Sequence, residues 1–109
     1  MAEFIELKQE DFQGSVLESN LPVLVEFGAE WCVPCKRIEP ILSKLGEQDW
    51  NNKVKLVKLD VDECVDLTIQ FQIMGVPTIM LFVQGEPVER LTGAQSRKKI
   101  VDKFSRYIL

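Results

Sequence analysis

The hydrophobic residues of this chain follow two patterns that alternate along its length. Short apolar runs rich in Val, Ile and Leu are typical of buried β-strands, and apolar residues spaced by three and four positions are typical of amphipathic helices. The strand pattern occurs at residues 4–7, 21–27, 54–61, 78–83 and 88–91. The last two runs flank the turn sequence of residues 84–87 (Gln-Gly-Glu-Pro), which predicts a β-hairpin.

The helical pattern fills the segments between these runs. We expect helices over residues 9–19 and 34–48, and two more that begin at the N-cap residues Asp62 and Ser96. Pro40 lies inside the second helix, where its missing N–H predicts a kink. Strands and helices therefore follow one another in the order βαβαβαββα.

This order predicts an α/β fold. Strands that alternate with helices pair in parallel under helices on both faces of the sheet, and a terminal hairpin adds antiparallel strands. We therefore expect a three-layer α/β/α sandwich with a mixed five-stranded sheet. A length of 109 residues with 46% hydrophobic residues fits a single domain, residues 1–109, with a substantial core.

Two cysteines mark the junction between a predicted strand and a predicted helix. Cys32 and Cys35 form a CxxC motif after the strand 21–27 and at the start of the helix 34–48. Open α/β sheets place their sites at the carboxyl ends of strands. The unpaired N–H groups and positive dipole end of a helix favour thiolate over thiol, and thiolate is the nucleophile of disulfide exchange. The motif therefore indicates a redox-active dithiol.

The cysteine content also has to be weighed against metal binding. CxxC pairs hold structural zinc, but such a site needs four ligands. The chain has three cysteines and no histidine, so Cys64 could only be a third ligand, with a carboxylate or water as the fourth. Zinc is the minor alternative, and we expect no metal. The lack of histidine also excludes Cys–His acyl transfer, because no imidazole can activate the sulfur.

Charge and composition narrow the range of partners. The formal net charge of −4 argues against nucleic acid, whose phosphates would repel the chain. The longest apolar runs have the length of strands, so we expect no membrane span. Residues 1–7 lack the basic start and long apolar stretch of a secretion signal. Together with an odd number of cysteines, this favours a reducing cytoplasm, where a CxxC is more often catalytic than structural.

Five pieces of the sequence carry a family resemblance. They are Val-Glu-Phe-Gly-Ala-Glu-Trp-Cys-Val-Pro-Cys-Lys at 25–36, Lys-Leu-Asp-Val-Asp at 58–62, Gly-Val-Pro-Thr at 75–78, Gly-Glu at 85–86 and Gly-Ala at 93–94. In this order and spacing they resemble the thioredoxin family over essentially the whole chain. The resemblance implies the thioredoxin fold and thiol–disulfide exchange, and we expect a monomer.

The resemblance also implies roles for individual residues. Cys32 would be the exposed nucleophile that attacks a substrate disulfide, and Cys35 the shielded resolving thiol that releases the reduced substrate. Pro77 matches the family's cis-proline facing the CxxC, and the backbone of Val76 would pair with an extended substrate segment. The implied substrate-binding surface consists of Trp31, Val33, Pro34, Val76, Gly93 and Ala94.

The chain departs from the family pattern at three positions near this site. Glu26 stands where thioredoxins commonly carry a buried aspartate that accepts the proton of the resolving cysteine. Poor solvation would raise the pKa of Glu26, and Lys58, which matches the family's buried lysine partner, would oppose that rise. A solvent-facing Glu26 is the alternative. Gly28 replaces a frequent tryptophan and Val33 the usual glycine, and we expect both to alter partner choice more than reaction type.

The predicted function is that of a general cytoplasmic protein-disulfide reductase and electron carrier. It would be recharged by a thioredoxin reductase, act on disulfide-containing proteins and bind no cofactor of its own. One alternative is an oxidase or isomerase of an oxidising compartment, but such relatives usually carry histidine where this chain has Pro34. Another is a binding module that uses the fold as a clamp. Outside the motif, Cys64 is expected to be a buried, inert thiol.

Overall fold

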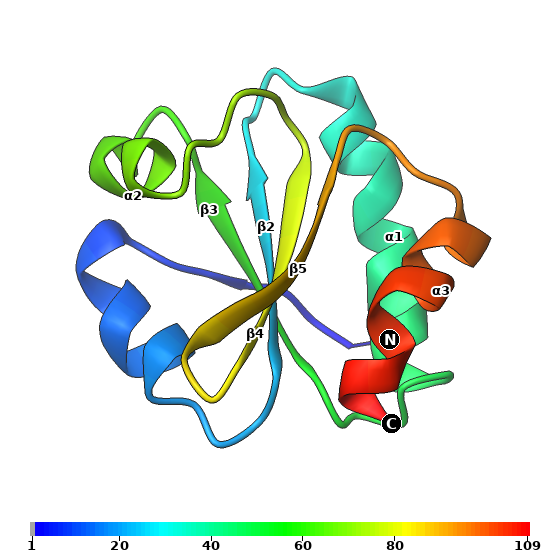
Figure 1. The fold of residues 1–109 in the computed structure, drawn as a ribbon. Helices are drawn as coiled ribbons and strands as arrows, with labels where there is room; N and C mark the ends of the chain where they lie inside the picture. Colours follow the sequence, from blue (N-terminus) through cyan, green and yellow to red (C-terminus); the bar gives the residue numbers. More distant parts are fainter. Residues whose placement is uncertain (1) are drawn as a thin grey trace.

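A mixed five-stranded sheet with the strand order β1-β3-β2-β4-β5 divides the molecule into three layers (Figure 1). The computed structural model describes residues 2–109, so Met1 of the predicted domain lies outside the described part. The strands are β1 (Ile5–Glu6), β2 (Val23–Gly28), β3 (Lys55–Asp60), β4 (Thr78–Val83) and β5 (Glu86–Thr92). β1, β3 and β2 are parallel, whereas β4 is antiparallel to β2 and β5. The predicted fold class is confirmed.

Helical segments cover both faces of the sheet. α1 (Val33–Glu47) and α3 (Arg97–Ile108) lie on one face, and α2 (Val65–Gln70) lies on the other with the segment that follows β1 (Figure 1). α1 contains Pro40 within its length. No helix in residues 2–109 has the length and apolar character needed to cross a bilayer.

The segment after β1 is not the regular helix that its sequence predicted. It consists of a 3₁₀ turn, η1 (Gln9–Asp11), followed by a π-helical turn, η2 (Gln13–Leu17). Gly14 lies in the middle of this segment and disfavours a regular helix. The irregular turns still bury Phe12 and Val16 against the sheet.

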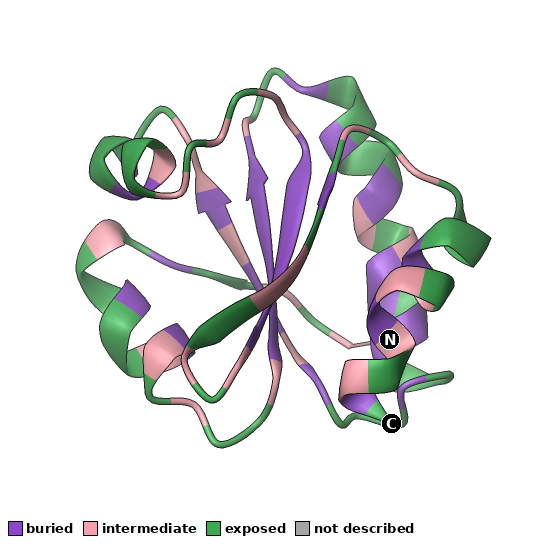
Figure 2. Cartoon of the chain, viewed as in Figure 1, coloured by how far each residue is buried: buried purple, intermediate pink, exposed green. Residues whose placement is uncertain are grey.

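The core consists of two hydrophobic clusters, one on each face of the sheet. Successive side chains of a strand point to opposite faces. In β2, Leu24 joins the cluster under α1 and α3, whereas Val25 and Phe27 join the cluster under α2. Glu26 and Gly28 lie two and four residues after Leu24, so they are on the same face of β2 as Leu24, the face that α1 covers. Every residue of β2 is buried, as the purple centre of the sheet shows in Figure 2.

The start of α2 differs from the prediction. Asp62 was expected to be the N-cap, but the structure begins the helix after Cys64, whose side chain makes no capping bond. The amides of Asp66 and Leu67 instead donate to Oε1 of Gln9, at 2.8 and 3.3 Å. The side chain of Gln9, which is distant in sequence, therefore accepts the hydrogen bonds of these first-turn amides. An N-cap side chain at Asp62 is not needed for this purpose.

The β4–β5 hairpin is tighter than predicted. Only Gln84 and Gly85 connect the two strands, and both have positive φ, 51° and 81°. The predicted turn at residues 84–87 was therefore too long, because Pro87 belongs to β5. It pairs with Phe82 beside a register shift. β5 is an edge strand, and edge strands tolerate the missing N–H of proline.

Candidate active site

The register of the sheet brings three loops to the same edge. Phe27 of β2 pairs with Thr78 of β4, which in turn pairs with Thr92 of β5. The loop after β2 therefore lies beside the loop before β4 and the loop after β5. The N–H of Gly93 donates to the C=O of Pro77 at 2.7 Å, which joins the last two loops. The predicted cysteine motif, proline loop and Gly-Ala pair thus meet at the carboxyl end of β2.

Cys32 and Cys35 form a disulfide at the start of α1. Cys32 is the N-cap residue of this helix, and its Sγ accepts a hydrogen bond from the N–H of Cys35 at 3.2 Å. Pro34 lies in the first turn, where its missing N–H costs nothing. The sulfur of Cys32 therefore lies at the positive end of the α1 dipole, as predicted.

The disulfide is less exposed than the sequence suggested. Cys32 was expected to be exposed, but the structure buries it almost as fully as Cys35, with 3% and 1% of their surfaces accessible. The bond draws the sulfur of Cys32 against the first turn of α1, where it accepts the Cys35 amide hydrogen. The neighbouring side chains of Trp31 and Val33 are exposed instead.

The predicted substrate-binding residues are accessible to different degrees. Trp31, Val33, Pro34 and Ala94 are exposed, and Val76 and Gly93 are half-buried. Pro77 is buried, and the Val76–Pro77 peptide bond is cis, as predicted.

The sequence did not indicate two further features near these residues. Met74 is 93% exposed, and Asp62 Oδ2 accepts a hydrogen bond from Nε1 of Trp31 at 2.9 Å. Asp62 therefore orients the exposed indole instead of capping α2.

Glu26 is buried behind the disulfide, on the face of β2 that meets α1. Only 1% of its surface is accessible, so the solvent-facing alternative is wrong. The pKa of Glu26 is raised to about 9, mainly by burial and then by the neighbouring charge of Glu39, while the charge of Lys58 opposes the rise. Neither Glu26 oxygen has a donor partner in residues 2–109. A carboxyl that is buried without a donor is more stable uncharged, so Glu26 holds a proton at neutral pH.

Lys58 opposes the rise in the pKa of Glu26, as expected, but it forms no ion pair with Glu26. The two residues are neighbours in the β2–β3 register. However, Nζ of Lys58 lies 3.5 Å from Oε1 of Glu39, and 36% of the lysine side chain is exposed. The long stem of lysine carries the charge past the sheet toward solvent, where α1 supplies Glu39. Sequence reasoning missed Glu39, although its position four residues after Cys35 places both on one face of α1.

Gly28 is buried between the carboxyl and the disulfide. A Cβ atom at this position would lie 3.1 Å from Oε2 of Glu26 and 3.2 Å from Sγ of Cys35. Both distances are short for carbon contacts, so a larger residue would have to push these groups apart. Glycine therefore leaves room for the glutamate beside the sulfur. The sequence suggested that Gly28 alters partner choice, whereas the structure places it away from the contact surface.

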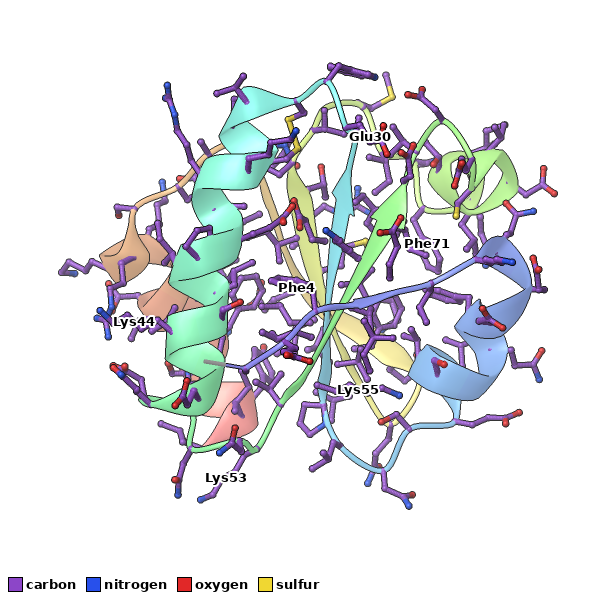
Figure 3. The ribbon with its side chains drawn as sticks, turned by 180° about the vertical axis from the view of Figure 1, so that it is seen from behind. Phe4, Glu30, Lys44, Lys53, Lys55 and Phe71 are labelled. Carbon is purple, nitrogen blue, oxygen red and sulfur yellow. A yellow bond between two sulfur atoms is a disulfide. The ribbon has the colours of Figure 1, made fainter. Side chains whose placement is uncertain are left out.

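A polar cleft of about 360 Å³ opens beside this buried group. Glu26, Glu39 and Lys58 line it. Its other charged lining residues are Glu6, Glu30, Lys36 and Asp60. Figure 3 shows Glu30 at the same end of the molecule as the start of α1. The cleft connects the region behind the disulfide with solvent.

The third cysteine lies apart from this site. Cys64 is free and buried, as predicted, on the α2 side of the sheet. Burial raises the pKa of its thiol, which favours the less reactive protonated form. Within residues 2–109, no group of three or more Cys, Asp or Glu side chains is arranged to hold a metal ion.

A disulfide at the N-terminus of a helix, with a buried carboxyl behind it and an apolar surface around it, supports exchange with other disulfides. The chain is accordingly a thiol–disulfide oxidoreductase. It belongs to the thioredoxin family, whose model matches residues 3–106. Members of this family reduce protein disulfides through the active-site dithiol.

Three relatives illustrate the similarity. The chain is 40% identical over 99 residues to Thioredoxin C-2 of Corynebacterium nephridii, an alignment that covers 91% of each chain. It is 37% identical over 97 residues to a thioredoxin of Synechocystis sp., which covers 89% of this chain and 90% of the relative. It is also 39% identical over 101 residues to the bifunctional thioredoxin reductase/thioredoxin of Mycobacterium leprae, which covers 93% of this chain and 22% of that protein.

Proposed function

We propose that the chain is a general protein-disulfide reductase of the cytoplasm that acts as a monomer and is recharged by a thioredoxin reductase. The observation that carries this proposal is the Cys32–Cys35 disulfide at the N-terminus of α1. The M. leprae relative joins a reductase and a thioredoxin in one chain, which supports the proposed partner. Pro34 between the cysteines favours a reductase over an oxidase or isomerase.

The first step is attack by the thiolate of Cys32 on a substrate disulfide. A bond forms between Cys32 Sγ and one substrate sulfur, and the other substrate sulfur leaves as a thiolate. The positive end of the α1 helix dipole and the hydrogen bond from the N–H of Cys35 stabilise negative charge on the sulfur of Cys32. Cys35 lies inside the first turn and is therefore assigned to the second step.

In the second step Cys35 attacks Cys32 and releases the reduced substrate. Its thiol must first lose a proton, and Glu26 is the proposed acceptor. The support for this role is position, because the Glu26 carboxyl and the Cys35 sulfur both lie within 3.2 Å of the point that a Cβ atom on Gly28 would occupy. Lys58 acts on Glu26 through its charge and through its ion pair with Glu39.

The substrate is proposed to bind as an extended segment over the three loops. The backbone N–H and C=O of Val76 have no backbone partner within residues 2–109, so both are available to pair with a substrate strand. Pro77 would hold this loop toward the disulfide. The proposed contact surface consists of Trp31, Val33, Pro34, Val76, Gly93 and Ala94.

The proposal can be tested by insulin-disulfide reduction with a thioredoxin reductase, together with a redox titration of the Cys32–Cys35 couple. We expect catalysis and a potential of about −270 mV, the value known for thioredoxins. A potential above roughly −200 mV would contradict a reductase. A variant with both cysteines changed to serine separates the alternatives, because a binding module would keep its function.

A further inference from the structure

The raised pKa of Glu26 leaves one part of the proposed reaction unexplained. A carboxyl that already holds a proton at neutral pH cannot accept another from Cys35. Its own proton has to leave before or during the transfer. Glu26 is almost fully buried and has no donor or base partner on the sheet other than the charge of Lys58. A base on another element that lines the same cleft is in a position to take up that proton.

Glu39 of α1 is in the position to do this. It lies four residues after Cys35, one helical turn along the same face of α1. Its carboxyl lines the same polar cleft as that of Glu26, and its charge raises the pKa of Glu26. The carboxyl of Glu26 and the Cys35 sulfur lie 3.1 and 3.2 Å from the point that a Cβ atom on Gly28 would occupy. Three groups thus form a path that begins at the buried sulfur and ends on α1.

The path continues from Glu39 to solvent. The Glu39 side chain is 27% exposed, in contrast to the buried Glu26. Its Oε1 atom forms an ion pair with Nζ of Lys58 at 3.5 Å, which favours the charged carboxylate form of Glu39. Glu26, Glu39 and Lys58 all line the polar cleft, which is large enough to hold several water molecules.

We propose that Glu39 carries the proton of Cys35 from Glu26 to the solvent of the cleft, a role that rests on the function proposed above for Glu26. Lys58 holds the Glu39 carboxylate in position for this transfer. Glu39 acts through Glu26 and not directly on the sulfurs, so it is a positioning residue.

The proton balance of the resolving step is then complete. Glu26 passes its proton to the Glu39 carboxylate and receives the proton of the Cys35 thiol, so Glu26 ends as it began. The Cys35 thiolate forms a bond to Sγ of Cys32, and the bond between Cys32 and the substrate sulfur breaks. The substrate leaves as a thiolate and takes its proton from water. Glu39 releases its extra proton into the cleft.

Other charged groups face the same cleft from each element around it. They are Glu6 from β1, Glu30 from the loop after β2, Lys36 from α1 and Asp60 from β3. The side-chain charges that shift the pKa of Glu26 are those of Glu39 and Lys58. Glu6 is exposed, so Glu6→Gln removes the same charge from the same cleft without touching the path and serves as the matched control.

The test is stopped-flow reduction of a disulfide peptide from about pH 6 to 9, with Cys32 attack and mixed-disulfide resolution measured separately. At about pH 7, Glu39→Gln should slow resolution by at least about tenfold, the lower range of proton-transfer effects, and leave the attack unchanged. Glu39→Asp should restore part of the rate. The defect of Glu39→Gln should shrink toward pH 9, because Glu26 then ionises and accepts the proton directly. Glu6→Gln should resemble the wild type.

The outcomes distinguish the relay from the role of Glu26. Slow resolution in Glu26→Gln with a normal rate in Glu39→Gln would overturn the relay and leave Glu26 as the acceptor. Normal rates in both variants would overturn both roles. Faster resolution in Glu39→Gln would mean that Glu39 only raises the pKa of Glu26, and equal slowing of attack and resolution would mean a structural defect. Either result would overturn the relay.

Discussion

The two sides of the Cys32–Cys35 disulfide differ sharply in character. In front, Trp31 and Val33 are apolar side chains that are largely exposed, so a substitution there removes few packing contacts. Behind, the carboxyl of Glu26 is buried, and the charges of Glu39 from α1 and Lys58 from β3 shift its pKa. Exposed apolar side chains serve recognition at little cost to folding, whereas a buried ionisable group affects both the chemistry and the stability. Substitutions on the two sides should therefore separate substrate binding from proton transfer.

The largest effects should come from the disulfide itself. Cys32→Ser should abolish insulin-disulfide reduction, because the nucleophile is lost. Cys35→Ser should still attack the substrate but remain bound to it, because no resolving thiol is present. Mass spectrometry of each variant after incubation with insulin would check this. A stable mixed disulfide through Cys35 in Cys32→Ser, and none in Cys35→Ser, would reverse the assigned order.

The next largest effect concerns the stability of the buried side. The pKa of Glu26 is raised from 4.5 to about 9, so between these values the folded chain holds a proton that the unfolded chain has released. The free energy of unfolding should therefore fall as pH rises through this window, by up to about 1.4 kcal/mol per pH unit. Glu26→Gln removes this dependence, and at about pH 7 it should stabilise the fold by on the order of 3 kcal/mol.

Urea unfolding of the wild type and Glu26→Gln at several pH values would measure this difference. The amide of glutamine has nearly the same shape as the protonated carboxyl and carries no charge. The Lys58–Glu39 ion pair stays intact, so no buried charge loses its partner. A parallel pH dependence in both proteins, or a loss of stability in the variant, would show that Glu26 is ionised at neutral pH.

A smaller effect is expected where the sulfur and the carboxyl meet. Gly28→Ala adds a Cβ at 3.1 to 3.2 Å from Glu26 and Cys35, so it should lower the free energy of unfolding by about 1–3 kcal/mol, the usual cost of overpacking. Combining it with Glu26→Asp shortens the carboxylate by one methylene and should recover part of the loss. A double-mutant cycle measured by urea unfolding tests this coupling, and strictly additive effects would contradict it.

The smallest change in stability is expected on the exposed side. Trp31→Ala should change the free energy of unfolding by about 0.5 kcal/mol or less, because the indole is 67% exposed. It should nevertheless raise the KM for insulin several-fold while leaving the reaction with a small aromatic disulfide unchanged. Asp62→Ala removes the acceptor that orients the indole and should give a weaker form of the same change. Equal effects on both substrates would place Trp31 in the chemistry instead of recognition.

The fold could be predicted where local patterns agree with tertiary packing. The apolar run that forms β4 was placed to the residue, and α1 was placed within one residue at each end. The prediction failed at residues 9–19, where Gly14 interrupts the helical pattern. It also failed at the start of α2, because Gln9 satisfies amides 57 and 58 residues away. Such long-range hydrogen bonds leave no local pattern.

The candidate site was predictable to the extent that it repeats family motifs. The disulfide, the cis-proline and the burial of Glu26 follow from those motifs and are seen in the structure. The partner of Lys58 was not predictable, because a long side chain can reach several carboxylates and only the packing of α1 selects Glu39. Glu39 lies outside the family motifs, so only its helical spacing from Cys35 could have indicated its place.

The most direct test of the division between the two sides is the kinetics of Glu26→Gln. A stopped-flow experiment with a disulfide peptide separates attack by Cys32 from resolution by Cys35. We expect an unchanged rate of attack and slower resolution from about pH 6 to 9, because the group that exchanges the proton of Cys35 is missing. An unchanged rate of resolution over this range would contradict this expectation and leave Glu26 as a buried strand residue without a role in the reaction.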